Sequence, residues 1–185
     1  KAASGHPERI NTCIACNQAC LDHIFNGQLS SCLVNPRACH ELELALAETR
    51  QCKQLAVIGA GPAGLAAAVT AAERGHSVSL FDAEDKIGGQ FNLARRIPGK
   101  EEFNETLRYY QAQLDKLGVD VQLNSRVTVS QLNDSNFDEV ILATGIVPRL
   151  PDIEGIDHPC VVNYVDVIRG NVEVGERVAI IGAGG

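Results

Sequence analysis

The sequence contains no methionine, and none of its apolar runs approaches the length of a membrane-spanning helix. The longest apolar runs have the length of β-strands, so we expect no membrane-embedded segment. The chain begins at Lys1 and stops at Gly185 inside a recognisable motif, and we therefore expect it to be a piece of a longer polypeptide. Without a true N-terminus, the lack of a visible signal peptide carries no information.

Basic residues are also scarce. Lysine and arginine together number 16 against 23 aspartates and glutamates, which gives a formal net charge of −7. A surface with an acidic excess is unsuited to nucleic acid or to an anionic membrane. We therefore expect neither among the partners of this chain.

Residues 55–82 read as a strand, a glycine-rich loop, a helix and a second strand. Residues 55–58 are an unbroken apolar run, which is typical of a parallel strand buried on both faces. Gly59, Gly61 and Gly64 follow with the spacing of a dinucleotide-binding fingerprint. The first glycine permits the tight turn, the second lets a pyrophosphate approach the backbone, and the third lets the helix pack closely on the strand.

A helix is predicted from Pro62 to Arg74, and its N-terminus would face the phosphates. Asp82 ends the second strand eighteen residues after Gly64, near the spacing of about 20 residues that is typical of a ribose-binding carboxylate. An acid at this place favours FAD or NAD over NADP. The alternative is a glycine-rich turn in an unrelated α/β protein, with Asp82 an ordinary solvated residue, and the two flanking strands argue against it.

A cluster of cysteines precedes the fingerprint. Cys13, Cys16 and Cys20 leave two and then three residues between them, and Cys32 follows after eleven more. Three thiolates on one tight loop can hold three corners of a cubane while the fourth returns to the remaining iron, so we predict a [4Fe–4S] cluster. The alternative is zinc, whose four thiolates more usually come as two close pairs. The neighbouring flavin-type site favours iron, because it gives iron a redox use.

The total of seven cysteines is odd, which argues against a disulfide scaffold. Clustered thiols beside a nucleotide domain are typical of a metal or cluster in a reducing compartment, so we predict a cytoplasmic location. The remaining cysteines, Cys39, Cys52 and Cys160, are expected to be small packed residues.

The later elements complete an α/β fold. A helix is predicted from Lys100 to residue 117, strands at residues 119–123, 126–129 and 137–144, and a repeat of the fingerprint with Gly182 and Gly184 in the loop of a second nucleotide domain. The predicted organisation is a tail of a preceding domain (1–9), a [4Fe–4S] segment (10–41), a partly helical linker (42–53), a Rossmann-like FAD-binding domain (54–150), and a crossover with the first strand of an NAD(P)H-binding domain (151–185).

Several stretches closely resemble bacterial NADPH-dependent 2,4-dienoyl-CoA reductases, which are iron–sulfur flavoenzymes of the old yellow enzyme and trimethylamine dehydrogenase type. The three-residue gap between Cys16 and Cys20 fits the reductases better than trimethylamine dehydrogenase. The stretches are INTCIACNQACLD (10–22), SCLVNPRACHE (31–41), GGQFN (88–92), IPGKEEF (97–103) and ATGIVPR (143–149).

The resemblance implies an FMN-binding barrel before this chain and an NADPH-binding domain after it. In that family NADPH reduces FAD, and electrons cross the [4Fe–4S] cluster to FMN, which reduces an unsaturated fatty acyl-CoA in β-oxidation. The resemblance thus implies an acyl-CoA substrate, and no catalytic residue is assigned to this chain. It implies a cluster held by Cys13, Cys16, Cys20 and Cys32, and FAD contacts from the glycine loop with Ala63, Asp82, Gln90, Lys100, Val127 and Gly145.

Two other classes stay open. One is an electron-transfer subunit resembling the small subunit of glutamate synthase, and the other is a nonenzymatic nucleotide-binding domain stapled by zinc. The residues that choose between NAD and NADP would lie beyond Gly185.

Overall fold

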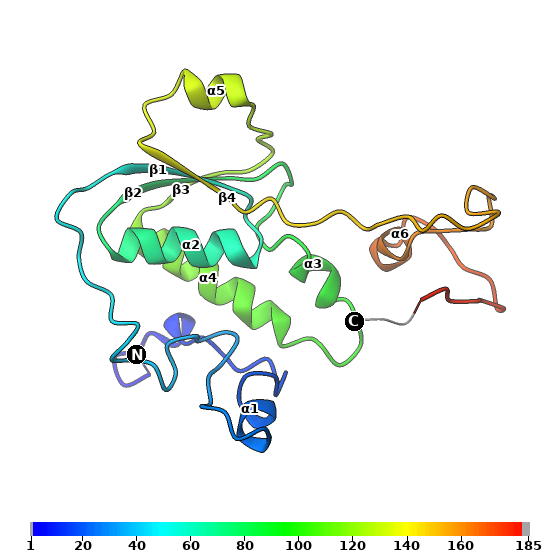
Figure 1. The fold of residues 1–185 in the computed structure, drawn as a ribbon, viewed down its shortest axis with the longest axis horizontal. Coiled ribbons are helices and arrows are strands. Elements are labelled where there is room, and N and C mark those ends of the chain that lie inside the picture. Colours follow the sequence, from blue (N-terminus) through cyan, green and yellow to red (C-terminus); the bar gives the residue numbers. More distant parts are fainter. Residues whose placement is uncertain (1, 183–185) are drawn as a thin grey trace. The chain divides into compact units, whose positions relative to one another are not determined.

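The computed structural model describes residues 2–182, which divide into two compact units at the bond between Gly145 and Ile146. The first unit is built on a four-stranded parallel sheet with the strand order β3-β2-β1-β4 (Figure 1). The predicted α/β, Rossmann-like fold is therefore confirmed. The strands are β1 (Gln54–Ile58), β2 (Ser77–Phe81), β3 (Asp120–Gln122) and β4 (Glu139–Leu142).

Two long helices cover one face of this sheet and lie side by side (Figure 1). They close a core in which Val57 of β1, Leu80 of β2, Leu65 of α2 and Leu114 of α4 have no exposed surface. No helix among the described residues is long and apolar enough to cross a bilayer. The helices are η1 (Pro7–Arg9), α1 (Leu21–Phe25), α2 (Pro62–Glu73), α3 (Phe91–Ala94), α4 (Phe103–Leu117), α5 (Val129–Asn133) and α6 (Tyr164–Arg169).

Helix α4 confirms the predicted apolar stripe. Leu107 and Leu114 are buried, and Gly118 ends the helix in the left-handed conformation with φ +67°. The start differs from the prediction by three residues, because Lys100 to Glu102 form a turn in which the Phe103 amide donates to the Lys100 carbonyl at 3.2 Å.

The strand predicted at residues 126–129 is wrong. Residues 126–128 are irregular, and Val129 begins α5. The Thr128 hydroxyl accepts from the Gln131 amide at 3.3 Å, and Gln131 Oε1 accepts from the Thr128 amide at 2.8 Å. This capping box satisfies two amides at a helix start, and it outweighs the strand propensity of the β-branched residues.

The linker at residues 42–53 contains no helix, contrary to the prediction. After a turn at residues 41–44 it runs without regular structure past the C-terminal end of α2. The Thr49 amide donates to the Arg74 carbonyl at 2.7 Å, and Arg74 Nε donates to the Ala47 carbonyl at 3.3 Å. These hydrogen bonds to the end of another helix replace the internal bonds that a linker helix would make.

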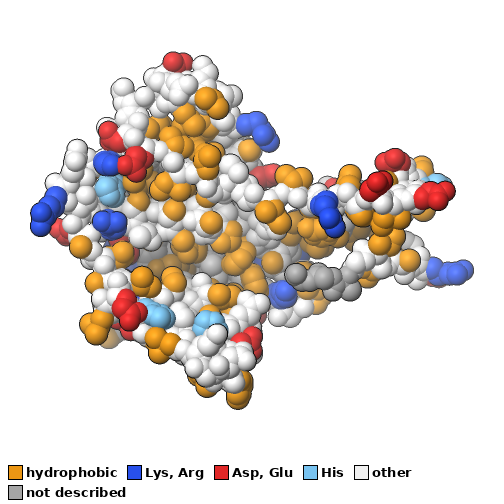
Figure 2. All heavy atoms as spheres, viewed as in Figure 1, with side chains coloured by type: hydrophobic (Ala, Val, Ile, Leu, Met, Phe, Trp, Pro, Cys, Tyr) orange, Lys and Arg blue, Asp and Glu red, His pale blue; other side chains and the backbone are white. Residues whose placement is uncertain are grey.

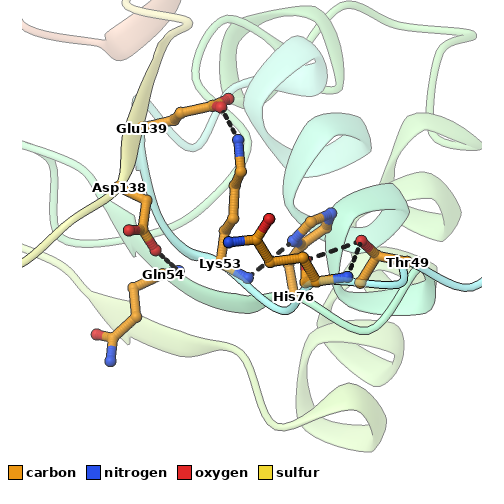
Figure 3. A network of polar contacts seen from close by, with 7 residues as sticks. Thr49, Lys53, Gln54, His76, Asp138 and Glu139 are labelled. Atoms are coloured by element: carbon orange, nitrogen blue, oxygen red, sulfur yellow. Dashed lines mark hydrogen bonds and ion pairs between the residues drawn. The ribbon is translucent and has the colours of Figure 1, made fainter.

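A network of polar contacts holds the end of the linker at the start of β1 (Figure 3). The Lys53 amide donates to His76 Nδ1 at 3.2 Å, and the Gln54 amide donates to Asp138 Oδ2 at 2.7 Å. Lys53 Nζ also pairs with the Glu139 carboxylate at the start of β4. The network joins the amino ends of three neighbouring strands, at the edge of the sheet opposite to the glycine loop.

The second unit contains α6 and otherwise irregular chain. The Asn163 side chain caps α6 by accepting from the Val165 amide at 2.8 Å. The strand predicted before Gly182 is not formed at residues 177–182, where Ile180 is 86% exposed. A strand of this apolar type needs parallel neighbours, and no described strand pairs with it. Gly182 has φ +95°, close to the +109° of Gly59, whereas Gly184 lies outside the described residues.

Candidate functional site

The loop between β1 and α2 passes very close to other backbone. Gly59 has φ +109°, and a Cβ there would lie 2.3 Å from the carbonyl oxygen of Ala143, which follows β4. A Cβ on Gly64 would lie 1.8 Å from the Gly59 carbonyl oxygen. These two glycines are therefore required by the packing of the protein itself.

Gly61 is different, because a Cβ there would only reach ordinary van der Waals contact with its neighbour. Its φ is −73°, which any residue adopts, and the atom nearest to an added Cβ is the Gly89 Cα at 4.0 Å. It is the N-cap of α2, and no side chain caps that helix. The first amides of α2 are therefore available to an anion, as expected of a pyrophosphate site at a helix N-terminus.

A second glycine loop lies over the first. The Gly88 amide donates to the Ala60 carbonyl at 2.7 Å, and a Cβ on Gly89 would lie 3.0 Å from the Gly61 Cα. Gln90, which resembles a family FAD contact, is exposed and caps the short helix α3. The FAD contact that the resemblance implies for Gln90 stays a prediction, and the position of the segment beside Gly61 is compatible with it.

Asp82 follows β2 directly and faces the glycine loop. Its Oδ2 accepts from the Ala60 amide at 2.5 Å, and its Oδ1 accepts from the Glu84 amide at 2.8 Å. A carboxylate offers about four acceptor positions, so each oxygen can still accept a hydroxyl. Asp82 can thus hold the loop in place and accept a ribose hydroxyl at the same time.

The remaining FAD contacts implied by the resemblance are spread around this edge. Ala63 is exposed in the first turn of α2, Val127 is half-buried after β3, and Gly145 follows β4 with φ +77°. Lys100 Nζ lies 5.8 Å from the centroid of the Phe103 ring. Backbone amides, first that of Glu101 itself and then that of Gly99, lower the pKa of the carboxyl of Glu101, the residue after Lys100. The roles of these residues as FAD contacts stay predictions.

The cysteine segment folds as a tight loop. Ala15 and Asn17 take left-handed conformations with φ +53° and +59°, which are uncommon without glycine. The turn lets the Ala15 amide donate to Cys13 Sγ at 3.3 Å. Amide hydrogen bonds to sulfur are one way in which proteins stabilise and tune thiolates that hold iron.

Cys32 is brought back to this loop by bonds on both of its sides. The Ser31 amide donates to the Ala19 carbonyl at 2.6 Å, and Asn11 Nδ2 donates to the Val34 carbonyl at 2.5 Å. Four thiolates are the donor set that a [4Fe–4S] cluster takes, so the residue types fit this group. The four sulfurs are not gathered around one point, since no group of three or more potential metal ligands occurs in the described part of the chain. The cluster stays a prediction.

The other three cysteines are not the packed residues that the sequence suggested. Cys39, Cys52 and Cys160 are all exposed. Cys39 lies in a surface turn with φ +65°, and its amide donates to the Glu41 carboxylate at 3.2 Å. None of them lies on a buried face of a helix or strand, so their apolar character gains nothing from burial.

Comparison with known families decides the assignment of the nucleotide-binding part. Residues 53–185 match the model of the pyridine nucleotide-disulphide oxidoreductase family. The chain belongs to this family. Membership implies an FAD- and NAD-binding Rossmann-like domain in an oxidoreductase, and the uncapped N-terminus of α2 and the acceptor positions of Asp82 fit FAD.

Similar proteins include other redox enzymes. A metal reductase of Desulforamulus reducens is 41% identical over the whole of this chain, and a bilirubin reductase of Mediterraneibacter gnavus is 36% identical, also over the whole chain. A solved complex of 2-naphthoyl-CoA reductase is 40% identical over 95% of the chain with a TM-score of 0.92, and the chain covers 27% of it. This chain spans only 28% of the length of the metal reductase and 29% of the length of the bilirubin reductase.

Sequence reasoning missed Arg108 of α4. Its guanidinium donates from Nη1 to the Glu8 carbonyl at 2.7 Å, from Nη2 to the Ile10 carbonyl at 3.0 Å, and from Nε to Glu105 Oε2 at 2.6 Å. Two of the three partners lie about a hundred residues away in the sequence. The local sequence shows only a charged residue on the polar side of an amphipathic helix, which gives no signal for such a contact.

Proposed function

We propose that this chain is the electron-input part of an NADPH-dependent reductase of the 2,4-dienoyl-CoA reductase type. In this proposal, reducing equivalents from NADPH reach an unsaturated acyl-CoA through FAD, a [4Fe–4S] cluster and FMN, the last bound by another part of the protein. The proposal includes a cytoplasmic location and neither nucleic acid nor membrane as a partner.

One observation carries the proposal. The likeness to the solved 2-naphthoyl-CoA reductase extends over 95% of the present chain. It therefore includes both the cysteine segment and the Rossmann-like sheet. That enzyme is named as a reductase of an aromatic acyl-CoA thioester. A substrate of the acyl-CoA class is therefore the best-supported choice, and the dienoyl chain follows from the resemblance in the cysteine segment and in residues 88–92.

The residues of this chain have definite tasks in such an enzyme. The first turn of α2 and Gly61 receive a pyrophosphate, and Asp82 accepts from a ribose hydroxyl while it holds the Ala60 amide. Cys13, Cys16, Cys20 and Cys32 supply four thiolates, of which Cys13 already accepts an amide hydrogen bond. When bound, FAD takes up a hydride and the cluster passes single electrons.

The test uses the protein purified under argon with its bound cofactors. Flavin, iron and acid-labile sulfide are quantified, and NADPH oxidation is followed with 2,4-hexadienoyl-CoA, with 2-naphthoyl-CoA and with N,N-dimethylglycine. We expect FAD, about four irons per chain, and NADPH oxidation that depends on hexadienoyl-CoA. Turnover of 2-naphthoyl-CoA alone would refute the dienoyl part, and turnover of neither thioester would refute the acyl-CoA class.

The amine N,N-dimethylglycine tests a second candidate function, the oxidation of an amine. Among the relatives, an N,N-dimethylglycine/sarcosine dehydrogenase of Chromohalobacter salexigens is 35% identical over 94% of this chain. Amine oxidation would send electrons in the opposite direction, out of the substrate. Reduction of the flavin by N,N-dimethylglycine without NADPH would therefore support this second function over the first.

A further inference from the structure

The forked guanidinium of Arg108 makes the hydrogen bonds that join α4 to the start of the cysteine segment. The Arg108 guanidinium uses Nη1 and Nη2 for the backbone carbonyls of Glu8 and Ile10, and Nε for the Glu105 carboxylate. Glu105 Oε2 is also 3.5 Å from the hydroxyl of Thr12. The residues held in this way end directly before Cys13, the first of the four cysteines.

Little apolar packing supports the contact that Arg108 makes with the start of the cysteine segment. A hollow of about 440 Å³ lies at the same contact, and among residues 2–53 only two hydrophobic side chains, Ile14 and Ala19, are buried. The side chains of Arg108 and Glu105 are 35% and 41% exposed, so water reaches the fork. The hollow is lined by Pro7, Glu8, Ile10, Thr12, Glu105 and Arg108.

The neighbouring residue on α4 contacts the nucleotide side. Leu107 is buried, and a Cβ on Gly88 would lie 2.8 Å from its Cδ2 atom. Gly88 in turn donates its amide to the Ala60 carbonyl in the glycine loop at 2.7 Å. Leu107 thus contacts the segment that covers the glycine loop, and Arg108, the next residue of the same helix, binds residues that precede Cys13.

We infer that Arg108, oriented by Glu105, is a positioning residue that fixes the cysteine loop at a set distance from the flavin site. The inference rests on the proposed function, in which electrons pass between these two places. Electron transfer slows steeply as the gap between two centres widens, so a loose segment would cost rate without removing either cofactor. A lysine cannot replace the arginine, because an ammonium lacks the planar fork that reaches two carbonyls and a carboxylate together.

The experiment compares Arg108→Lys, Arg108→Ala and Glu105→Gln with the unchanged protein, all purified under argon with their cofactors. The matched control is Arg50→Lys, which changes an exposed arginine of the linker. Five quantities are measured: FAD per chain, iron per chain, the electron paramagnetic resonance spectrum of the reduced cluster, the rate at which NADPH reduces the cluster, and amide hydrogen exchange at residues 9–16.

We expect Arg108→Lys to keep its FAD, iron and spectrum while amide exchange at residues 9–16 accelerates and cluster reduction slows by about tenfold or more, as small misplacements of reacting groups do. Glu105→Gln should slow the reduction less, since the guanidinium keeps both carbonyl bonds. Arg50→Lys should match the unchanged protein.

Several results would overturn the inference. An unchanged reduction rate in both Arg108 variants would show that the fork does not set the distance. Loss of iron or FAD in both of them would mean that Arg108 is needed for assembly and not for positioning. If the unchanged protein lacks iron, the proposed function fails and the inference fails with it, which the metal analysis distinguishes from the first two results.

Discussion

Residues 54–145 bury a continuous apolar cluster drawn from β1, β2, α2 and α4, whereas residues 2–53 bury only Ile14 and Ala19 among their hydrophobic side chains. Much of the remaining apolar surface of the first segment is exposed, including Phe25 at 82%, and hydrophobic side chains are visible there in Figure 2. The nucleotide part therefore has a core that can hold its shape. The cysteine segment depends on hydrogen bonds, on Arg108 and, in our proposal, on bound iron.

Loss of the proposed iron should give the largest difference between the two parts, because it should affect the cysteine segment and leave the nucleotide part unchanged. We expect Cys32→Ser to lose its bound iron completely and residues 10–34 to exchange their amides freely, while FAD binding persists. Cys39→Ser should keep its iron, because Cys39 is exposed outside the loop. Iron analysis and hydrogen exchange measure both effects. Equal iron loss in the two variants, or stoichiometric zinc without iron, would contradict the cluster assignment.

A substitution in the apolar core should affect the nucleotide part more than the cysteine segment. Leu80 has no exposed surface in the middle of the sheet, so Leu80→Ala should lower the free energy of unfolding by about 2–5 kcal/mol. Ile14→Ala should cost less, since Ile14 lies in a loop with few buried neighbours. Urea denaturation of each variant gives the two values. A larger loss for Ile14→Ala would mean that the cysteine segment has a core of its own.

Replacing Asp82, the proposed ribose-binding residue, should weaken FAD binding. Asp82→Ala removes a charged acceptor worth about 1.5–3 kcal/mol, so the dissociation constant of FAD should rise about tenfold to a hundredfold. Asp120→Asn is the control, because that carboxylate bonds to Ser79 and Gln122 at β3. Flavin fluorescence titration measures both. An unchanged dissociation constant in Asp82→Ala would remove Asp82 from the site.

The glycine loop allows stability and binding to be distinguished. Gly64→Ala should cost about 1–3 kcal/mol of stability, since its Cβ would lie 1.8 Å from the Gly59 carbonyl oxygen. Gly61→Ala meets no protein atom closer than 4.0 Å, so it should cost less stability but still weaken FAD binding. Thermal midpoints and flavin titrations of the two variants give the comparison. Similar thermal losses in both would show that Gly61 is also a packing residue.

The smallest expected effect concerns the network of Figure 3. The hydrogen bond and charge of Glu139 raise the pKa of Lys53 above its ordinary value of 10.5. A raised folded-state pKa means that the pair's contribution is complete below pH 10.5 and is lost as the pH rises through the folded-state pKa. The thermal midpoint of Glu139→Gln should therefore lie slightly below that of the unchanged protein at pH 8. The difference should vanish in strong alkali, and it should be absent for Glu176→Gln in the second unit.

The sequence predicted the nucleotide part well, because its signals are local. The apolar run of β1, the glycine spacing and the periodicity of α4 each fix an element with no knowledge of distant partners. The strand predicted at residues 126–129 was wrong, since a capping box between Thr128 and Gln131 competes with strand propensity over the same few residues.

The other misses depend on contacts between distant residues. The linker forms its hydrogen bonds with Arg74 instead of within itself, and the Arg108 fork joins residues about a hundred positions apart. Neither has a pattern that a reader of one sequence can recognise. The segment before Gly182 is a further case, since its apolar strand-like pattern forms no strand where no described strand pairs with it.

Strand β4 lies at one edge of the sheet, with Leu142 74% exposed. An edge strand presents unpaired amides and carbonyls, and natural proteins usually protect such an edge with charge, proline or a covering segment. The four residues of β4 contain no proline, and their one charge, Glu139, is paired with Lys53. Among the described residues of the first unit no further strand pairs with β4, so the solubility of any excised form of the domain will depend on how well β4 is covered.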